Sequence, residues 1–111
     1  MTLCEGLLEV LQLEGFQAIG IESGDAAYVA ARRLRPDLII CDYALPGRSG
    51  NDVVRELRAD PEMASIPIVI VTGYSDHSIR KKIIESGADA YLLKPFSMAD
   101  LLRVVASYLP H

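Results

Sequence analysis

Three polar residues that could carry out phosphoryl chemistry each stand at the end of an apolar run in this sequence. Asp42 follows "DLIIC", Thr72 closes "PIVIVT", and Lys94 follows "DAYLL". A carboxylate can act as a nucleophile or a metal ligand, a hydroxyl can donate a hydrogen bond to a phosphoryl oxygen, and an ammonium group can balance negative charge. If these side chains meet in the fold, they predict a site for phosphoryl transfer.

The segments that must position these residues alternate between two kinds of apolar pattern. Continuous apolar runs are typical of strands buried on both faces of a parallel sheet, and spacings of three and four are typical of helices. The predicted strands are 16–21, 37–41, 67–72 and 89–93, and the predicted helices are 2–13, 23–34, 50–60, 76–87 and 97–109. We therefore expect an α/β fold with a doubly wound parallel sheet, whose ligands gather outside the carboxyl ends of the strands.

Capping signals support two of the predicted helices. Asp76 or Ser75 is placed to cap the helix 76–87 at its start, and Gly87 is placed to end it. Ser97 and Asp100 have the spacing of a capping box at the start of the last helix.

Size and composition favour one soluble domain over residues 1–111. The chain has 111 residues, half of them hydrophobic, which is enough for one core. It shows neither the roughly 18 apolar residues of a membrane span nor a secretory leader, so we expect a cytoplasmic location and no membrane partner. Its net charge of −4 argues against direct binding of nucleic acid.

Local groups of basic residues and the cysteines have simple structural interpretations. Arg32, Arg33 and Arg35, like Arg80, Lys81 and Lys82, are predicted to lie on solvated helix faces. Cys4 and Cys41 lack the spacing of metal ligands and are expected to be reduced, buried thiols.

Each candidate site residue also has an ordinary alternative. Asp42 could cap the following turn, Thr72 could be a β-branched strand residue, and Lys94 could be a surface lysine. Their joint position after three apolar strands is what favours the phosphoryl site.

The sequence resembles the response-regulator receiver domain of two-component signalling. The resemblance runs from the first helix to the last and rests on "DLIICDYALPGRSG", "PIVIVTGYSD" and "GADAYLLKPF". It implies a flavodoxin-like fold in which Asp42 accepts a phosphoryl group, Thr72 is the switch hydroxyl, Lys94 contacts the phosphoryl group, and Tyr91 is the aromatic switch. It also implies a cis Lys94–Pro95 peptide bond.

The resemblance further implies partners and a metal. The phosphoryl donor would be a histidine kinase or phosphotransfer protein, and a downstream protein target would read a switched surface around residues 76–109. The domain would thus be a two-state element rather than an enzyme. Family members hold Mg²⁺ through the acceptor aspartate, an acidic pair, and a backbone carbonyl that corresponds to Ala44 here.

The chain departs from the family pattern at its beginning. The family strand order is 2-1-3-4-5, but only four strands are encoded here, and the first strand with its acidic pair would fall before Met1. We therefore expect weak or no Mg²⁺ binding. Either the strand at 16–21 pairs directly with that at 37–41, or a second copy supplies contacts in a homodimer with exchanged or edge-paired elements. Alternatively, the natural protein begins upstream, or this receiver is part of something larger.

Two other function classes compete with the phosphoacceptor. A dehalogenase-like phosphotransferase needs a second aspartate two residues after the first, and Ala44 stands there. A receiver-like interaction module that works without phosphorylation is favoured by the missing acidic pair, whereas the set of Asp42, Thr72 and Lys94 argues against it.

Overall fold

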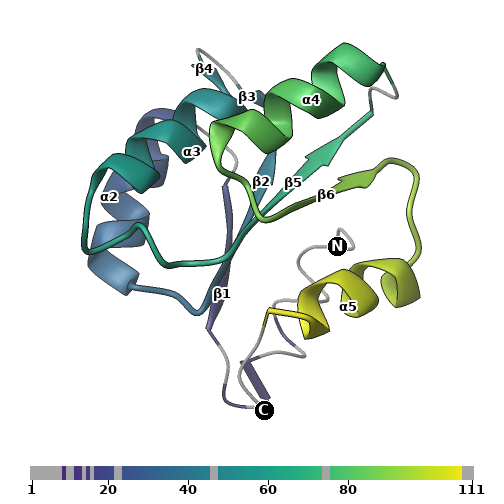
Figure 1. Ribbon diagram of the computed structural model, residues 1–111. Coiled ribbons are helices and arrows are strands. Elements are labelled where there is room, and N and C mark those ends of the chain that lie inside the picture. The colour runs from purple at the N-terminus through teal and green to yellow at the C-terminus, as the bar shows by residue number, and fades with distance from the viewer. Residues whose placement is uncertain are drawn as a thin grey trace.

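The computed structural model describes residues 17–21, 24–45, 48–73 and 76–108, together with the single positions 9, 12, 13 and 15. Figure 1 labels the elements in chain order. They are β1 (Ala18–Ile21), α2 (Gly24–Leu34), β2 (Leu38–Asp42), β3 (Ala44–Leu45), β4 (Arg48–Ser49), α3 (Gly50–Ala59), β5 (Ile68–Thr72), α4 (His77–Ser86), β6 (Ala90–Leu93) and α5 (Met98–Ala106). Most of the helix predicted over 2–13 lies outside the described residues.

The main sheet has four parallel strands in the order β1-β2-β5-β6, as expected for a flavodoxin-like fold. Ile21 of β1 pairs with Cys41 of β2, so the strand predicted over 16–21 does pair directly with the strand predicted over 37–41. This pairing is the first of the two arrangements expected from the sequence. It leaves β2 flanked on both sides and carries its last residue, Asp42, to the carboxyl edge of the sheet.

The helix caps follow the local sequence signals. Asp76 caps α4 through the backbone N–H of Ser78, and Gly87 ends this helix with a φ of 106°, in the left-handed region that favours glycine. Ser97 and Asp100 form the expected capping box of α5. Two features were not predicted: a second capping box, between Ser49 and Asp52 at the start of α3, and the short antiparallel pair of β3 and β4 that precedes it.

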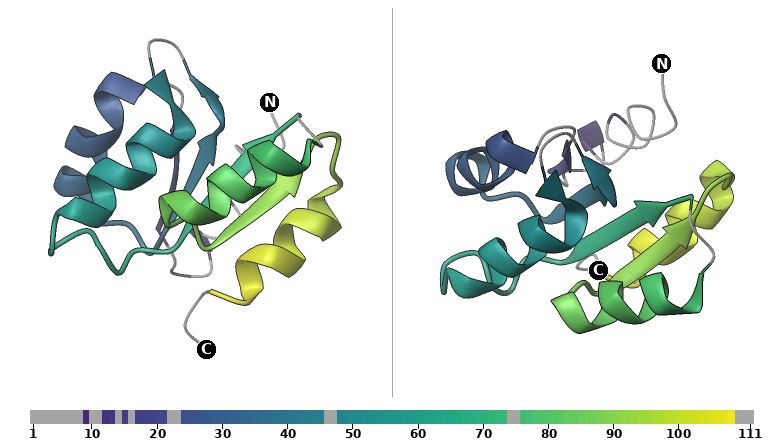
Figure 2. Two further views of the ribbon diagram at one scale, coloured as in Figure 1. Left: turned by 45° about the horizontal axis from the view of Figure 1, so that its top comes forward. Right: turned by 90° about the horizontal axis from the view of Figure 1, so that it is seen from above.

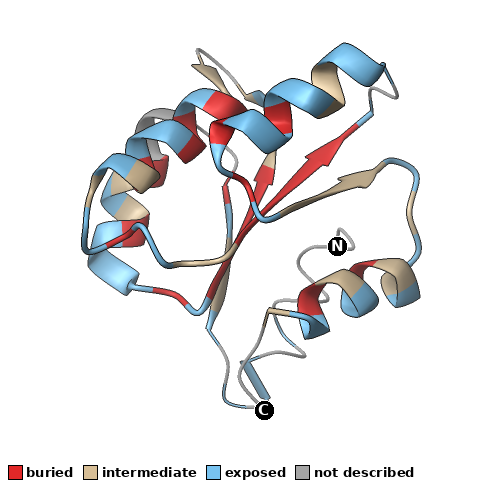
Figure 3. Ribbon diagram, viewed as in Figure 1, coloured by how far each residue is buried: buried red, intermediate tan, exposed pale blue. Residues whose placement is uncertain are grey.

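The two central strands are buried on both faces because their alternate side chains enter two separate cores. Ile39, Cys41, Ile68 and Ile70 enter one core, and Leu38, Ile40, Val69 and Val71 enter the other. The first core lies under α2, α3 and α4, and α5 covers the opposite face, as the two views of Figure 2 show. In Figure 3, β2 and β5 are the buried centre of the sheet.

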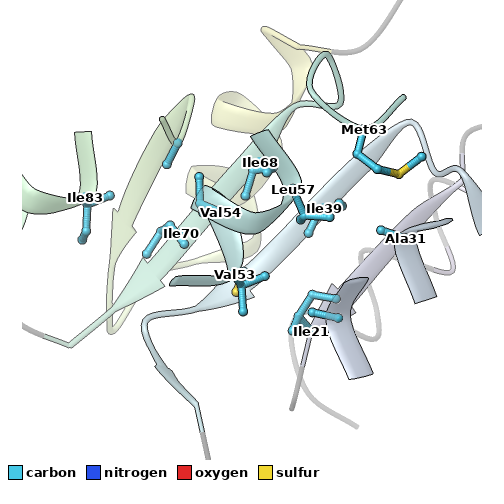
Figure 4. Packing of buried hydrophobic residues seen from close by; sticks show 13 residues of the cluster. Ile21, Ala31, Ile39, Val53, Val54, Leu57, Met63, Ile68, Ile70 and Ile83 are labelled. Atoms are coloured by element: carbon cyan, nitrogen blue, oxygen red, sulfur yellow. The ribbon is translucent and has the colours of Figure 1, made fainter. Parts of the chain in front are cut away.

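The helix side of the first core is supplied by small and branched residues. Figure 4 shows Val53, Val54 and Leu57 of α3 against the strands, with Ala31 of α2 and Ile83 of α4 on either side. All five side chains are essentially inaccessible to solvent. This packing fixes the sheet edge from which the candidate site residues project. No helix among the described residues is long and apolar enough to span a membrane.

Arg58, at the end of α3, ties together the opposite end of the sheet. Its guanidinium donates hydrogen bonds to the backbone carbonyls of Gly87 at 3.0 Å, Ala64 at 2.9 Å and Ile66 at 2.7 Å. It also pairs with Asp89 Oδ2 at 2.6 Å. One side chain therefore joins α3 to the segments that lead into β5 and β6.

We expect Arg58→Met to lower the free energy of unfolding by about 2–4 kcal/mol, because the change leaves several carbonyls and a carboxylate without their donor. Arg55→Met on the same helix is the matched control. The Arg55 side chain is 59% exposed and pairs only with Asp52 among the described residues, so its loss should cost at most about 0.5 kcal/mol. Urea denaturation of both variants measures the difference, and equal midpoints would contradict the role of Arg58.

Candidate functional site

The three candidate residues stand at the carboxyl edge of the sheet, as the sequence predicts. Asp42 is the last residue of β2, Thr72 is the last of β5, and Lys94 directly follows β6. Asp42 pairs with Val71 in the ladder between β2 and β5, and Thr72 pairs with Leu93 in the next ladder. The three side chains therefore come from neighbouring strands at nearly the same level.

The Asp42 carboxylate is engaged at both oxygens. Lys94 Nζ donates to Oδ2 at 2.7 Å, and the backbone N–H of Ala44 donates to Oδ1 at 3.2 Å. The side chains of Lys94 and Asp42 are 47% and 38% exposed, so solvent screens the pair and its contribution to stability is small. The pair therefore places a positive charge directly against one oxygen of a partly exposed carboxylate.

Backbone hydrogen bonds hold both charged residues in place. The N–H of Tyr43 donates to the Val71 carbonyl at 2.8 Å, which extends the ladder between β2 and β5 past Asp42. The N–H of Lys94 donates to the Thr72 carbonyl at 2.8 Å, and the Lys94–Pro95 bond is cis, as expected. Thr72 is fully buried at the centre of the three strand ends.

Gly50 lies against the backbone of Asp42 and Tyr43, a contact that was not predicted from the sequence. A Cβ atom at this position would stand 2.7 Å from the Asp42 carbonyl oxygen and 3.1 Å from Tyr43 Cα. The N–H of Gly50 also donates to the Tyr43 carbonyl at 2.7 Å. The only sequence signal for this close approach is the glycine that follows the turn-forming run after Asp42.

We expect Gly50→Ala to lower the free energy of unfolding by about 1–3 kcal/mol, because the clash is with backbone atoms that cannot rotate away. Gly73→Ala is the matched control, since a Cβ there would meet nothing within 4 Å among the described residues. Thermal and urea unfolding of the two variants test the contact. A Gly50→Ala protein as stable as the Gly73→Ala protein would refute it.

Cys41, next to Asp42 in β2, is a buried and free thiol, as expected. Burial, followed by the negative charge of Asp42, raises the pKa of the Cys41 thiol to about 12. The thiol is therefore neutral at physiological pH and does not compete with Asp42 as a nucleophile. Cys4 lies outside the described residues.

Tyr91 lies on β6, where it pairs with Ile70 of β5 and packs at the margin of the first core. The Arg80 guanidinium of α4 lies over its ring, 5.7 Å from the centroid. This contact corrects one expectation, because Arg80 is partly buried whereas its neighbours Lys81 and Lys82 are solvated as predicted. The helical pattern alone did not distinguish the three.

Comparison with known proteins decides the family. The sequence model of the response regulator receiver domain matches residues 1–106. The chain belongs to this family. Receiver domains are phosphoacceptor modules of two-component signalling, and the fold and the strand-end residues described above agree with that function.

Relatives of this receiver domain include a DNA-binding response regulator and a polar-differentiation response regulator. The DNA-binding response regulator MtrA of Mycobacterium tuberculosis is 44% identical over 108 residues, which are 97% of this chain and 46% of that protein. The polar-differentiation response regulator DivK of Brucella anthropi is 34% identical over 101 residues, 91% of this chain and 82% of that protein. The chain thus spans about half the length of relatives such as MtrA.

Solved structures agree with the family. A putative response regulator from Chloroflexus aurantiacus superposes with a TM-score of 0.82 and 32% identity, over 96% of this chain and 87% of that one. The receiver domain of a sensor histidine kinase from Pseudomonas aeruginosa, with a magnesium ion in its active site cleft, has a TM-score of 0.77 and 30% identity, over 94% and 86% of the two chains.

The described residues of this receiver do not make up a complete Mg²⁺ site. They offer the Asp42 carboxylate, already paired with Lys94, and the backbone carbonyl of Ala44. Across the described ranges, no group of three or more His, Cys, Asp and Glu side chains could hold a metal ion. Because Mg²⁺ requires octahedral oxygen coordination, these donors alone do not fit it.

Proposed function

We propose that Asp42 is the phosphoacceptor of this receiver domain and that Lys94 and Thr72 stabilise the transferred group. The observation that carries the assignment is the 2.7 Å contact between Lys94 Nζ and Asp42 Oδ2 at the carboxyl edge of the sheet. A positive charge thus lies where a phosphoryl group on Asp42 would add negative charge.

The chemistry is a transfer between two nucleophiles. A carboxylate oxygen of Asp42 forms a bond to phosphorus while the bond from phosphorus to an imidazole nitrogen of the donor breaks. The electron pair of that bond stays with the imidazole, and the product is an aspartyl phosphate. Lys94 then donates to a phosphoryl oxygen, and the Thr72 hydroxyl on the neighbouring strand donates to another.

The consequence of transfer is a shift between two conformations rather than catalytic turnover, so we propose that the domain is not an enzyme. Contacts of Thr72 and Lys94 with the phosphoryl group favour the conformation that makes them, and Tyr91 on β6 moves with it. The donor would be a histidine kinase or a phosphotransfer protein, and a protein target would bind the switched surface. We propose that the domain acts in the cytoplasm and does not itself contact DNA.

We also propose that Mg²⁺ binds the Asp42 and Ala44 groups weakly, since these supply few of its oxygen ligands. Tyr43 adjoins Asp42 and the chain has no tryptophan, so tyrosine fluorescence can follow a Mg²⁺ titration. Tight, saturable binding that is lost in an Asp42→Asn protein would contradict weak coordination.

Phosphoryl uptake itself tests the function. The protein is incubated with phosphoramidate, with Mg²⁺ or with a chelator, and its intact mass is measured over time. We expect the mass to increase by one phosphoryl group. Failure of any adduct to form, with or without Mg²⁺, would sink the proposal and support a module that works without phosphorylation.

A further inference from the structure

The contact between Arg80 and Tyr91 joins α4 to β6. Arg80 lies in the first half of α4, and its guanidinium carbon is 5.7 Å from the centre of the Tyr91 ring on β6. This distance is within the range of a cation–π interaction. In the part of the chain that the structure describes, no acidic side chain forms an ion pair with Arg80. The ring face is therefore the principal electrostatic partner of the guanidinium there.

The Nε–H of Arg80 adds a second observation. This donor is buried and finds no hydrogen-bond acceptor among the described residues. A buried donor without an acceptor is unfavourable, so no hydrogen bond of the Nε–H holds Arg80 in its present position. The position is favoured instead by packing of the guanidinium on Tyr91, and it is open to change when the ring moves.

Tyr91 is linked to the proposed phosphoryl site through the pairing of β5 with β6. It pairs with Ile70, while Leu93, two residues on, pairs with Thr72. Because side chains of a strand alternate between faces, Tyr91 lies on the same face of the sheet as Thr72, on the side that α4 covers. Lys94 follows Leu93 and donates its N–H to the Thr72 carbonyl. A shift of Thr72 or Lys94 toward a phosphoryl group is therefore transmitted to Tyr91 through one ladder.

We propose that Arg80 is a positioning residue that holds Tyr91 in its resting position and thereby opposes the conformational change caused by phosphorylation of Asp42. This inference rests on the proposed function. A contact present only in the resting conformation raises the population of that conformation and, by linkage, lowers the tendency of the site to take up a phosphoryl group by the same factor. The strength of a partly desolvated cation–π contact corresponds to a factor of roughly 3 to 30.

The test uses Arg80→Met, which keeps an unbranched aliphatic stem and removes the cation. Lys81→Met is the matched control on the same helix, because the Lys81 side chain is 69% exposed and pairs only weakly with Glu85 at 3.9 Å. Circular dichroism and thermal unfolding check that both variants fold. The proteins carry fluorotyrosine, and a Tyr91→Phe protein identifies the fluorine resonance of Tyr91.

Two readouts follow from the proposal. The Tyr91 fluorine resonance should shift in Arg80→Met and stay in place in Lys81→Met. The initial rate of phosphoryl uptake from phosphoramidate should rise roughly 3- to 30-fold in Arg80→Met and be unchanged in Lys81→Met. A merely structural role of Arg80 would lower stability without accelerating uptake.

The opposite outcomes separate the proposals. An unmoved Tyr91 resonance in Arg80→Met would overturn the positioning role, and a moved resonance with unchanged uptake would overturn the coupling to Asp42. If the unmodified protein takes up no phosphoryl group, the proposed function fails and the coupling fails with it. In that case the fluorine resonance still decides whether Arg80 positions Tyr91.

Discussion

Asp42→Asn is expected to abolish phosphoryl uptake from phosphoramidate, by at least about 1,000-fold in initial rate. The amide keeps one acceptor oxygen, which can accept from Lys94 or from the Ala44 N–H but not from both. Since the site is partly exposed, the local structure should survive. What the amide lacks is the negatively charged nucleophile that forms the bond to phosphorus. Intact-mass spectrometry over time measures the loss, and urea unfolding should show a change of less than about 1 kcal/mol.

Asp76→Asn is the matched control for this variant. Asp76 is an exposed aspartate that caps α4, and asparagine caps helices about as well as aspartate. The control should therefore accept the phosphoryl group at the rate of the unmodified protein. An Asp42→Asn protein that is labelled as fast as the Asp76→Asn protein would show that the acceptor is another residue.

Lys94→Met should slow phosphoryl uptake by about 100-fold, because removal of one preorganised donor to a site of developing charge has effects of this size. Among the described residues, Lys94 is the cation that contacts Asp42. Its Nζ lies 2.7 Å from Asp42 Oδ2. Stability should change by no more than about 1 kcal/mol, since both partners are more than one-third exposed. A large kinetic effect with a small thermodynamic effect is thus the signature of this residue.

Lys82→Met, on the exposed face of α4, is the control for loss of one positive charge from the surface. It should react at the unmodified rate, and Lys94→Arg should recover part of the activity because it restores the charge with different geometry. Equal rates for the Lys94→Met and Lys82→Met proteins would mean that Lys94 does not stabilise the transferred group.

Much of this fold could be predicted because its signals are local. The buried strands β2 and β5 were recognisable as continuous apolar runs, and Gly87 marked the end of α4. Since parallel strands share one carboxyl edge, the positions of Asp42 and Thr72 in the site followed from the strand pattern.

The remaining features depend on contacts between segments far apart in the sequence. Arg58 and Arg55 stand about one helical turn apart on α3, yet only Arg58 reaches the carbonyls before β5 and β6. Arg80 and Lys81 are neighbours, yet only Arg80 lies on an aromatic ring among the described residues. Residue type is the same or similar within each pair, so only the packing of the helices distinguishes them.

The direct pairing of β1 with β2 could be predicted only in part. From the sequence, the strand at 16–21 was expected either to pair directly with that at 37–41 or to leave edges that a second copy would satisfy. Pairing within one chain satisfies the β2 edge through the register of Ile21 with Cys41. The short hairpin of β3 and β4 was not predicted, because a strand of two residues is too short to show a recognisable apolar pattern.

The identity of the phosphorylated residue is the central claim, and chemical mapping tests it most directly. Borohydride reduction converts an aspartyl phosphate into homoserine, which peptide mass spectrometry locates after treatment of the protein with phosphoramidate. We expect homoserine at position 42, in the peptide that contains the run "DLIICDYALPGR", and at no other aspartate. Homoserine at a different position, or none in a protein that has gained a phosphoryl group, would contradict the assignment of Asp42.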